Sequence, residues 1–300
     1  MLKIAYDPIF AHPLPEGHRF PMLKYELIPE QLLHEGLITS QNLFHPEAVD
    51  EDIILLTHDE AYWHQLRDLT LPPKEIRRIG FPLSARLVER SRRIAKGTID
   101  GALYAFENKI AFNAAGGTHH AGTNWGEGFC LLNDQAIAAN YLLSKQLASL
   151  ILIVDLDVHQ GNGTAQIFEH EDRVFTFSMH GANNFPARKE QSSLDIPLPD
   201  GLGDEGYLDI LTATLTKLIE KLNPDFIFYQ AGVDVLATDK LGKLKLSKEA
   251  CKARDRFVFE QCLAHNIPVQ VSMGGGYSPQ VKDIVEAHVN TFRVAIDLYF

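Results

Sequence analysis

The chain has 300 residues, and its hydrophobic fraction of 45% and charged fraction of 22% are those of one large globular domain, not of a disordered chain. The net charge of -11 argues against a general nucleic-acid-binding protein, which needs a basic surface. Three cysteines without CxxC spacing cannot form a disulfide framework, and the sequence shows neither a signal peptide nor a membrane-length apolar segment. We therefore expect a single cytoplasmic domain over residues 1–300 that binds neither nucleic acid nor a membrane.

Short apolar segments alternate with longer segments of helical periodicity along the chain. We expect buried strands at residues 3–6, 110–113, 150–158, 174–179, 225–230 and 268–272. We expect helices near residues 84–106, 131–148, 206–222, 247–266 and 278–290. This alternation predicts an α/β fold, with a mostly parallel central sheet flanked by helices on both faces. Two segments that contain prolines, 71–82 and 186–203, are expected to be long surface loops.

Polar residues follow four of the predicted strands. The segments are GGTHH (116–120), DLDVH (155–159), AGVD (231–234) and GGGY (274–277). In open parallel sheets, ligands bind outside the carboxyl ends of the strands. We therefore expect these four segments to meet at one edge of the sheet and to form a site there.

The DLDVH segment places a polar residue at every second position. On a strand, Asp155, Asp157 and His159 would share one face, whereas Leu156 and Val158 would point into apolar packing. Three ionisable groups on so apolar a strand are costly to bury unless a cation offsets them. The alternative is that the two aspartates only cap or turn the chain at the end of the strand.

Asp234 is the next candidate ligand, because it follows an apolar strand that ends in Ala231-Gly232. Two carboxylates and one imidazole, with an open position for water, are typical of a catalytic metal site. Zinc suits such a set, and iron(II) or manganese is compatible with the same ligand types.

His119 and His120 follow two glycines, which allow the backbone to leave the strand and direct both rings into one cleft. An imidazole beside an activated water can act first as general base and then as general acid. The alternatives are that both histidines bind a second metal, or that they are only polar loop residues.

The GGGY segment lacks the spacing of a phosphate-binding loop. We expect it to be a turn that presents Tyr277 to the site, where a phenol can donate a hydrogen bond to an oxyanion. The alternative is a tyrosine that packs against a neighbouring helix.

Taken together, these segments resemble the histone deacetylase superfamily, whose members have the arginase-like α/β fold. The matching segments, in chain order, are GGTHHAG (116–122), GFCLLND (128–134), VDLDVHQGNGT (154–164), FSMH (177–180), QAGVDVLATDKLG (230–242) and GGGY (274–277). HQGNG and AGVDVLATDKLG look most like the class IV branch. Acetylpolyamine amidohydrolases share the same core, so the resemblance leaves the substrate open.

The resemblance implies that Asp157, His159 and Asp234 are zinc ligands. It also implies that His120 is the proton shuttle and that His119 is its electrostatic partner.

Two further residues gain roles from the resemblance. Asp155 would accept a hydrogen bond from His119. Asn162 stands where many family members have an aspartate paired to the second histidine. An amide stabilises an imidazolium less than a carboxylate does, so His120 should lose its proton more easily here.

The resemblance also implies a tunnel for the acyl-lysine side chain. Gly128 and Phe129 match one wall, with the Gly128 carbonyl facing the substrate amide, and Phe185 matches the opposite wall. Arg19 and Phe81, from the loops near 12–20 and 71–82, are candidates for the rim of the entrance.

A monovalent-cation site, for potassium, is a further implication of the resemblance. The residues that match it are Asp155, Asp157, His159, Ser178 and Met179.

The implied activity is metal-dependent hydrolysis of an N-ε-acyl-lysine amide, acetyl or longer, in a peptide or protein. One alternative is an amidohydrolase for acetylpolyamines or other small acylated amines, and another is a non-catalytic acyl-lysine binder. An arginase-type dimanganese enzyme would need further carboxylates after Asp234, and residues 235–238 supply none. Cys130 is interpreted as a small core residue and not as a nucleophile.

Overall fold

The computed structural model describes residues 1–300 and is built on one sheet of eight strands. Every pairing is parallel, and the strand order is β2-β1-β3-β8-β7-β4-β5-β6. The strands are β1 (Lys3–Ala5), β2 (Leu43–Phe44), β3 (Ile110–Asn113), β4 (Ile151–Asp155), β5 (Val174–Gly181), β6 (Leu194–Leu198), β7 (Phe226–Gln230) and β8 (Val269–Ser272).

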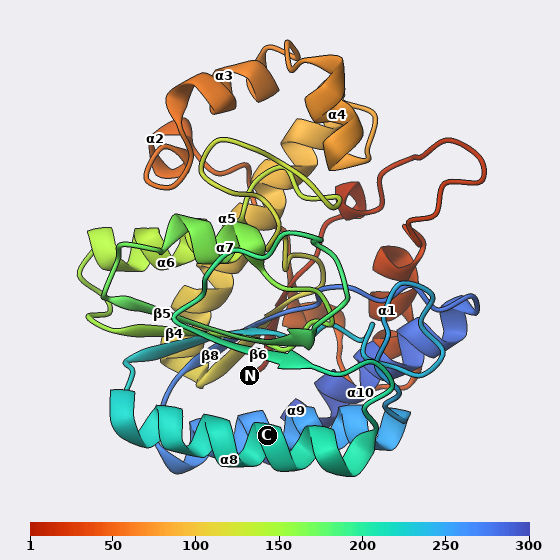
Figure 1. Ribbon diagram of the computed structural model, residues 1–300, viewed down its shortest axis with the longest axis vertical. Coiled ribbons are helices and arrows are strands. Elements are labelled where there is room, and N and C mark those ends of the chain that lie inside the picture. Colours follow the sequence, from red (N-terminus) through yellow and green to blue (C-terminus); the bar gives the residue numbers. More distant parts are fainter.

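Helices cover both faces of this sheet (Figure 1). One face packs against α1 (Lys24–His34), α8 (Asp204–Leu222), α9 (Lys248–Ala264) and α10 (Val281–Tyr299), and the other packs against α5 (Ala85–Asn108) and α6 (Asp134–Ser144). Each face has its own cluster of buried apolar side chains, of 44 and 36 residues. Burial on both faces explains why the central strands are continuously apolar. The predicted α/β class is confirmed.

The remaining helices are short. They are α2 (Glu51–Ile54), α3 (Glu60–Arg67), α4 (Pro73–Ile79) and α7 (Asn162–Ile167), with 3-10 turns at Pro8–Phe10 and Ser40–Asn42. In Figure 1, α2, α3 and α4 form a separate group at the top of the view, beyond the end of α5. None of the helices combines the length and the apolar character that crossing a membrane requires.

Side-chain caps begin several of the long helices where the sequence predicts helical segments. Ser84 accepts a hydrogen bond from N of Leu87 at the start of α5, and Ser247 accepts one from N of Ala250 at the start of α9. Such caps satisfy backbone donors that the first turn of a helix leaves free.

The two proline-containing segments are not the unstructured loops that the sequence pattern predicts. Residues 71–82 contain α4, because Pro73 fits the first turn of a helix and Gly80, with φ of +86°, ends it. Residues 186–203 contain β6, which pairs only with β5 and so tolerates Pro197 at the edge of the sheet.

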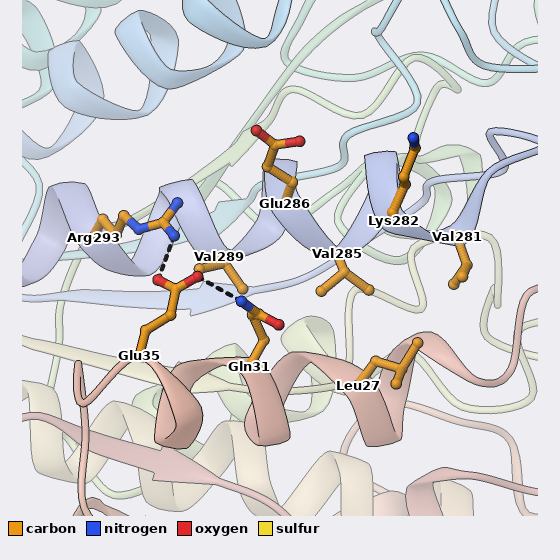
Figure 2. A pocket seen from close by; sticks show the side chains of 9 residues that line it. All are labelled: Leu27, Gln31, Glu35, Val281, Lys282, Val285, Glu286, Val289 and Arg293. Atoms are coloured by element: carbon orange, nitrogen blue, oxygen red, sulfur yellow. Dashed lines mark hydrogen bonds and ion pairs between the residues drawn. The ribbon is translucent and has the colours of Figure 1, made fainter.

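A pocket lies between α1 and α10, away from the polar segments, and Figure 2 shows its lining. Leu27 and Val285 are among its apolar lining residues. At one end, Glu35 binds Arg293 and Gln31. This groove shares no lining residue with the site at the carboxyl ends of the strands.

Candidate metal centre and active site

The four polar segments lie at one edge of the sheet. Their strands, β3, β8, β7 and β4, are consecutive neighbours and run parallel. Their carboxyl ends therefore deliver segments 116–120, 274–277, 231–234 and 155–159 to the same place. The expected convergence is present.

Three buried side chains bring potential ligand atoms together at this edge: Asp157, His159 and Asp234. Their ligand atoms all lie within 4.8 Å of one another. Nδ1 of His159 is 3.0 Å from Oδ1 of Asp157 and 3.1 Å from Oδ2 of Asp234. This set can hold an ion and still leave it a position for water or substrate.

The segment that carries Asp157 and His159 is not the regular strand that the alternation predicts, since β4 ends at Asp155. Oδ1 of Asp155 accepts a hydrogen bond from N of Asp157 (3.1 Å), and Oδ1 of Asp157 accepts one from N of His159 (3.0 Å). The aspartates therefore turn the chain, as the alternative interpretation holds, and also face the site. Leu156 and Val158 point into the core, as expected.

Backbone donors fix the other oxygens of the two carboxylates. N of Val158 donates to Oδ1 of Asp234 (2.9 Å), and N of Gly275 donates to Oδ2 of Asp157 (2.7 Å). These bonds orient the carboxylates before any ion binds, which favours a fixed coordination geometry.

Asp157, His159 and Asp234, called the triad below, are buried ionisable groups whose charges a bound cation would stabilise. Burial and the carboxylate of Asp157 raise the pKa of Asp234 to about 7. Burial disfavours the charged form of His159, but Asp157 and Asp234 outweigh it and raise the pKa of the imidazole to about 10. Protons must otherwise neutralise this cluster, and a divalent ion with nitrogen and oxygen ligands fits the same position.

Gly275 leaves the space that the carboxylates occupy. A Cβ at this position would overlap the carboxylate of Asp234 and come within 2.9 Å of Oδ2 of Asp157. We expect Gly275→Ala to weaken zinc affinity by roughly 10- to 100-fold, as measured by competition with a chelating dye. Gly203→Ala is the control, since its nearest neighbour is 4.0 Å away. Equal affinity in the two variants would show that the carboxylates need not hold this position.

The two adjacent histidines have different partners. Nδ1 of His119 is 2.7 Å from Oδ2 of Asp155, and Nδ1 of His120 is 2.7 Å from Oδ1 of Asn162. Burial opposes the charged form of His119, but Asp155 outweighs it and raises the pKa of His119. Burial, together with the charges of His119 and His159, lowers the pKa of His120 well below its usual value. The two imidazoles therefore differ in basicity, and His120 is the one whose neutral form is favoured.

Glu127 determines how the Asn162 amide is oriented. Nδ2 of Asn162 donates to Oε1 of Glu127 (2.7 Å), and an ionised carboxylate can only accept. Oδ1 of Asn162 must then face His120 and accept from Nδ1–H, which leaves Nε2 of His120 with its lone pair. Arg78 pairs with Glu127 on the other side of that carboxylate. No sequence motif indicated Glu127, although it directly precedes the GFC segment.

Exchanging the groups at positions 127 and 162 tests this arrangement. The double variant Glu127→Gln with Asn162→Asp keeps the total charge but places the carboxylate next to His120. We expect the pKa of His120 to rise, so the limb of the pH–rate profile that this histidine governs should move up by about one pH unit. Profiles of kcat/KM for both proteins measure it. An unchanged profile would show that the residue at 162 does not control His120.

Tyr277 lies beside the triad. It lines the same pocket as His120 and His159, with its ring centroid 6.2 Å from that of His159. Burial and the nearby carboxylates raise the pKa of its phenol well above the usual value, so the hydroxyl stays a hydrogen-bond donor. Asp239 accepts a hydrogen bond from N of Tyr277 (2.6 Å) and holds the residue in place.

The expected tunnel residues line the approach to the triad. Phe129 and Phe185 border a cavity of about 200 Å³ together with Gly128, His120 and Tyr277. Gly128, with φ of +56°, lies against the His120 ring, where a Cβ would come within 2.6 Å of it. The aromatic side chains give this entrance apolar walls.

The structure separates the two rim candidates. Arg19 is exposed at the entrance, and its guanidinium lies 5.1 Å from the centroid of the Phe129 ring. Phe81 is not at the rim: it is 2% exposed and packs behind Phe129 and Phe20, with ring centroids 5.1 and 5.0 Å apart. The prediction for Phe81 is wrong because this apolar side chain completes the aromatic core of the tunnel wall.

Three of the proposed potassium residues, Asp155, Ser178 and Met179, lie on the neighbouring strands β4 and β5, and Asp157 and His159 follow β4. Asp155 at the end of β4 is paired in register with Ser178 of β5, and Met179 follows, fully buried. Oγ of Ser178 lies 3.0 Å from Nδ1 of His180. The potassium site stays a prediction.

Cys130 is buried beside the tunnel. Burial raises the pKa of its thiol, and Sγ lies 3.4 Å from the carbonyl oxygen of Gly128. A protonated thiol is a poor nucleophile, which agrees with its interpretation as a core residue.

Residues 18–292 match the family model described as the histone deacetylase domain. The chain belongs to the histone deacetylase family, which consists of metal-dependent amidohydrolases, and the triad is a candidate site for the family's metal.

Relatives agree with this family. The chain is 46% identical to an uncharacterized protein of Picosynechococcus sp., over 99% of both chains. It is 30% identical to histone deacetylase B of Dictyostelium discoideum, covering 89% of this chain and 66% of that relative. It is 27% identical to histone deacetylase 2 of Arabidopsis thaliana, covering 91% of this chain and 73% of that relative.

Solved structures show the same fold. The chain superposes on an HDAC homologue complexed with SAHA with a TM-score of 0.84 at 26% identity, covering 97% of this chain and 82% of that one. An HDAC homologue from Aquifex aeolicus gives a TM-score of 0.82 at 25% identity, with the same coverage.

Proposed function

We propose that this protein hydrolyses N-ε-acyl-lysine amides in peptides or proteins, with zinc as its resident ion. One observation carries the proposal: the buried ligand atoms of Asp157, His159 and Asp234 lie together, and the pocket that Asp157 and His159 line also holds the imidazole of His120 and the phenol of Tyr277. The aromatic side chains of Phe129 and Phe185 in the cavity that leads to the triad support the lysine substrate, since the methylene stem of lysine packs well on aromatic walls. The histone deacetylase names of the relatives agree with it.

The residues divide the chemistry among them. An ion held by the triad would lower the pKa of water and polarise the acyl carbonyl. His120 accepts a proton through Nε2 as water attacks the carbonyl carbon. His119 lies beside it, with ring centroids 4.1 Å apart, and Asp155 holds the His119 ring through Nδ1. Tyr277 donates a hydrogen bond to the developing oxyanion. The proton then passes to the leaving amine. The products are a carboxylate and a peptide whose lysine side chain carries a free amine.

The experiment is turnover of matched acetyl-, octanoyl- and myristoyl-lysine peptides, and of acetylpolyamines, by protein of measured zinc content. We expect zinc-dependent removal of the acyl group from at least one acyl-lysine peptide, at a higher kcat/KM than for any acetylpolyamine. Class IV relatives are associated with long fatty acyl groups, so a preference for a longer acyl group would agree with the resemblance to that branch. Turnover of polyamines alone would replace the substrate that we propose, and binding without turnover would indicate an acyl-lysine binder.

A further inference from the structure

The entrance of the tunnel is basic, although the chain as a whole carries a net charge of -11. The residues that line the outer cavity include three arginines, Arg19, Arg77 and Arg78, and no aspartate or glutamate. All three arginines are exposed. The positive charge at this place is therefore local, and it opposes the average charge of the surface.

Two of these arginines have no carboxylate partner. Arg78 pairs with Glu127 and lies 4.0 Å from Glu75, so its charge is already balanced. Neither Arg19 nor Arg77 has a carboxylate oxygen within 4.0 Å of its guanidinium. Two free cations thus remain at the rim.

The fold holds these cations against the tunnel wall. Nε2 of His18 lies 2.9 Å from the carbonyl oxygen of Gly80, which ties the loop before Arg19 to the end of α4. N of Phe129 donates to the carbonyl oxygen of Ile79 (2.7 Å) and ties the same end of α4 to the wall. Arg19 itself stacks on Phe129. Both cations therefore line the cavity that leads to the tunnel wall.

The other lining residues of the cavity supply no free acid. Leu241 and Phe185 are among them, and Lys240, next to Leu241 in the chain, is exposed. The nearby Asp239 is turned inward, where its carboxylate accepts from N of Leu241 and N of Tyr277. A polycation that approaches this cavity therefore meets arginines and no lining carboxylate.

We propose that the entrance selects acyl-lysine residues in acidic sequence contexts, through the free guanidinium groups of Arg19 and Arg77. This inference rests on the proposed function and names the substrate class within it. Acidic flanks would pair with Arg19 and Arg77, whereas basic tails and polyamines would be repelled. Because the rim is exposed, the effect is screened by salt, with a Debye length of about 10 Å at 0.1 M.

The test uses three peptides with one central acyl-lysine, flanked on each side by two Glu, two Ala or two Lys. At about 20 mM salt we expect kcat/KM to be roughly tenfold higher for the Glu-flanked than for the Lys-flanked peptide, and the ratio to fall towards one near 1 M salt. Arg77→Glu should reduce the ratio, and Arg19→Glu with Arg77→Glu should invert it. Since Arg19 also packs on Phe129, the single Arg77→Glu variant separates charge from packing.

Lys221→Glu is the matched control, because it makes the same change of charge at an exposed position on α8, on the opposite side of the sheet from α4 (Figure 1). It should leave the ratio unchanged. Equal turnover of the three peptides, or a preference for Lys flanks, overturns the inference and leaves the proposed hydrolysis intact. Absence of turnover with all three peptides overturns the proposed function, and the inference with it.

Discussion

Asp234→Asn is expected to abolish zinc binding and turnover together. The variant keeps an acceptor oxygen for N of Val158 but removes one of the two carboxylates within reach of Nδ1 of His159. Because burial and Asp157 raise the pKa of Asp234, the charged form of this carboxylate is disfavoured in the ion-free protein.

Thermal unfolding with and without zinc measures the loss of zinc binding. A ligand at a thousand times its Kd adds about 4 kcal/mol to the free energy of unfolding, so the wild-type Tm should rise with zinc and that of the variant should not. Asp209→Asn, at an exposed position on α8, is the control and should behave as the wild type. An Asp234→Asn protein with full zinc content would show that this residue is not a ligand.

Tyr277→Phe is expected to lower kcat by roughly 10²- to 10³-fold, which is the usual loss for one oxyanion donor, or about 3–4 kcal/mol. The phenyl ring keeps the packing against Phe20 and Phe129, with ring centroids 6.0 and 6.1 Å away. Zinc content and KM should therefore change little, and the loss should appear in kcat.

The matched change is Tyr104→Phe on α5, where the ring packs against Phe44 outside the site. It should leave the rate unaltered. A Tyr277→Phe enzyme with the full wild-type rate would remove this hydroxyl from the mechanism and leave the oxyanion to other donors.

The sequence predicts the place of the site because parallel strands end at a common edge. Segments 116–120, 155–159, 231–234 and 274–277 follow strands that are neighbours in the sheet. The sequence does not give the order of those strands. Buried apolar segments followed by ionisable groups are nevertheless rare, and they therefore indicate this edge of the sheet.

Local geometry at the metal centre is less predictable. A two-residue alternation reads as a strand, yet Asp155 and Asp157 bond to the backbone two residues further on and turn the chain. Side-chain bonds of this kind compete with a regular strand, and the pattern of apolar residues does not reveal them. The prolines at 73 and 197 obscured a helix start and an edge strand, because proline fits the first turn of a helix and an edge strand as well as a loop.

Residues that act through a partner are the hardest to predict. Glu127 gains its role only because Asn162, distant by 35 positions, approaches it in the fold. Phe81 and Arg19 looked alike as rim candidates, and only packing assigns one to the aromatic core and the other to the surface.

Anomalous diffraction at the zinc edge, from crystals of the zinc-loaded protein, tests the central claim most directly. We predict one peak, with Nδ1 of His159 and one oxygen each of Asp157 and Asp234 at about 2.0–2.2 Å from it. Absence of a peak between these side chains, or a pair of ions bridged by carboxylates, would contradict a single-ion hydrolase.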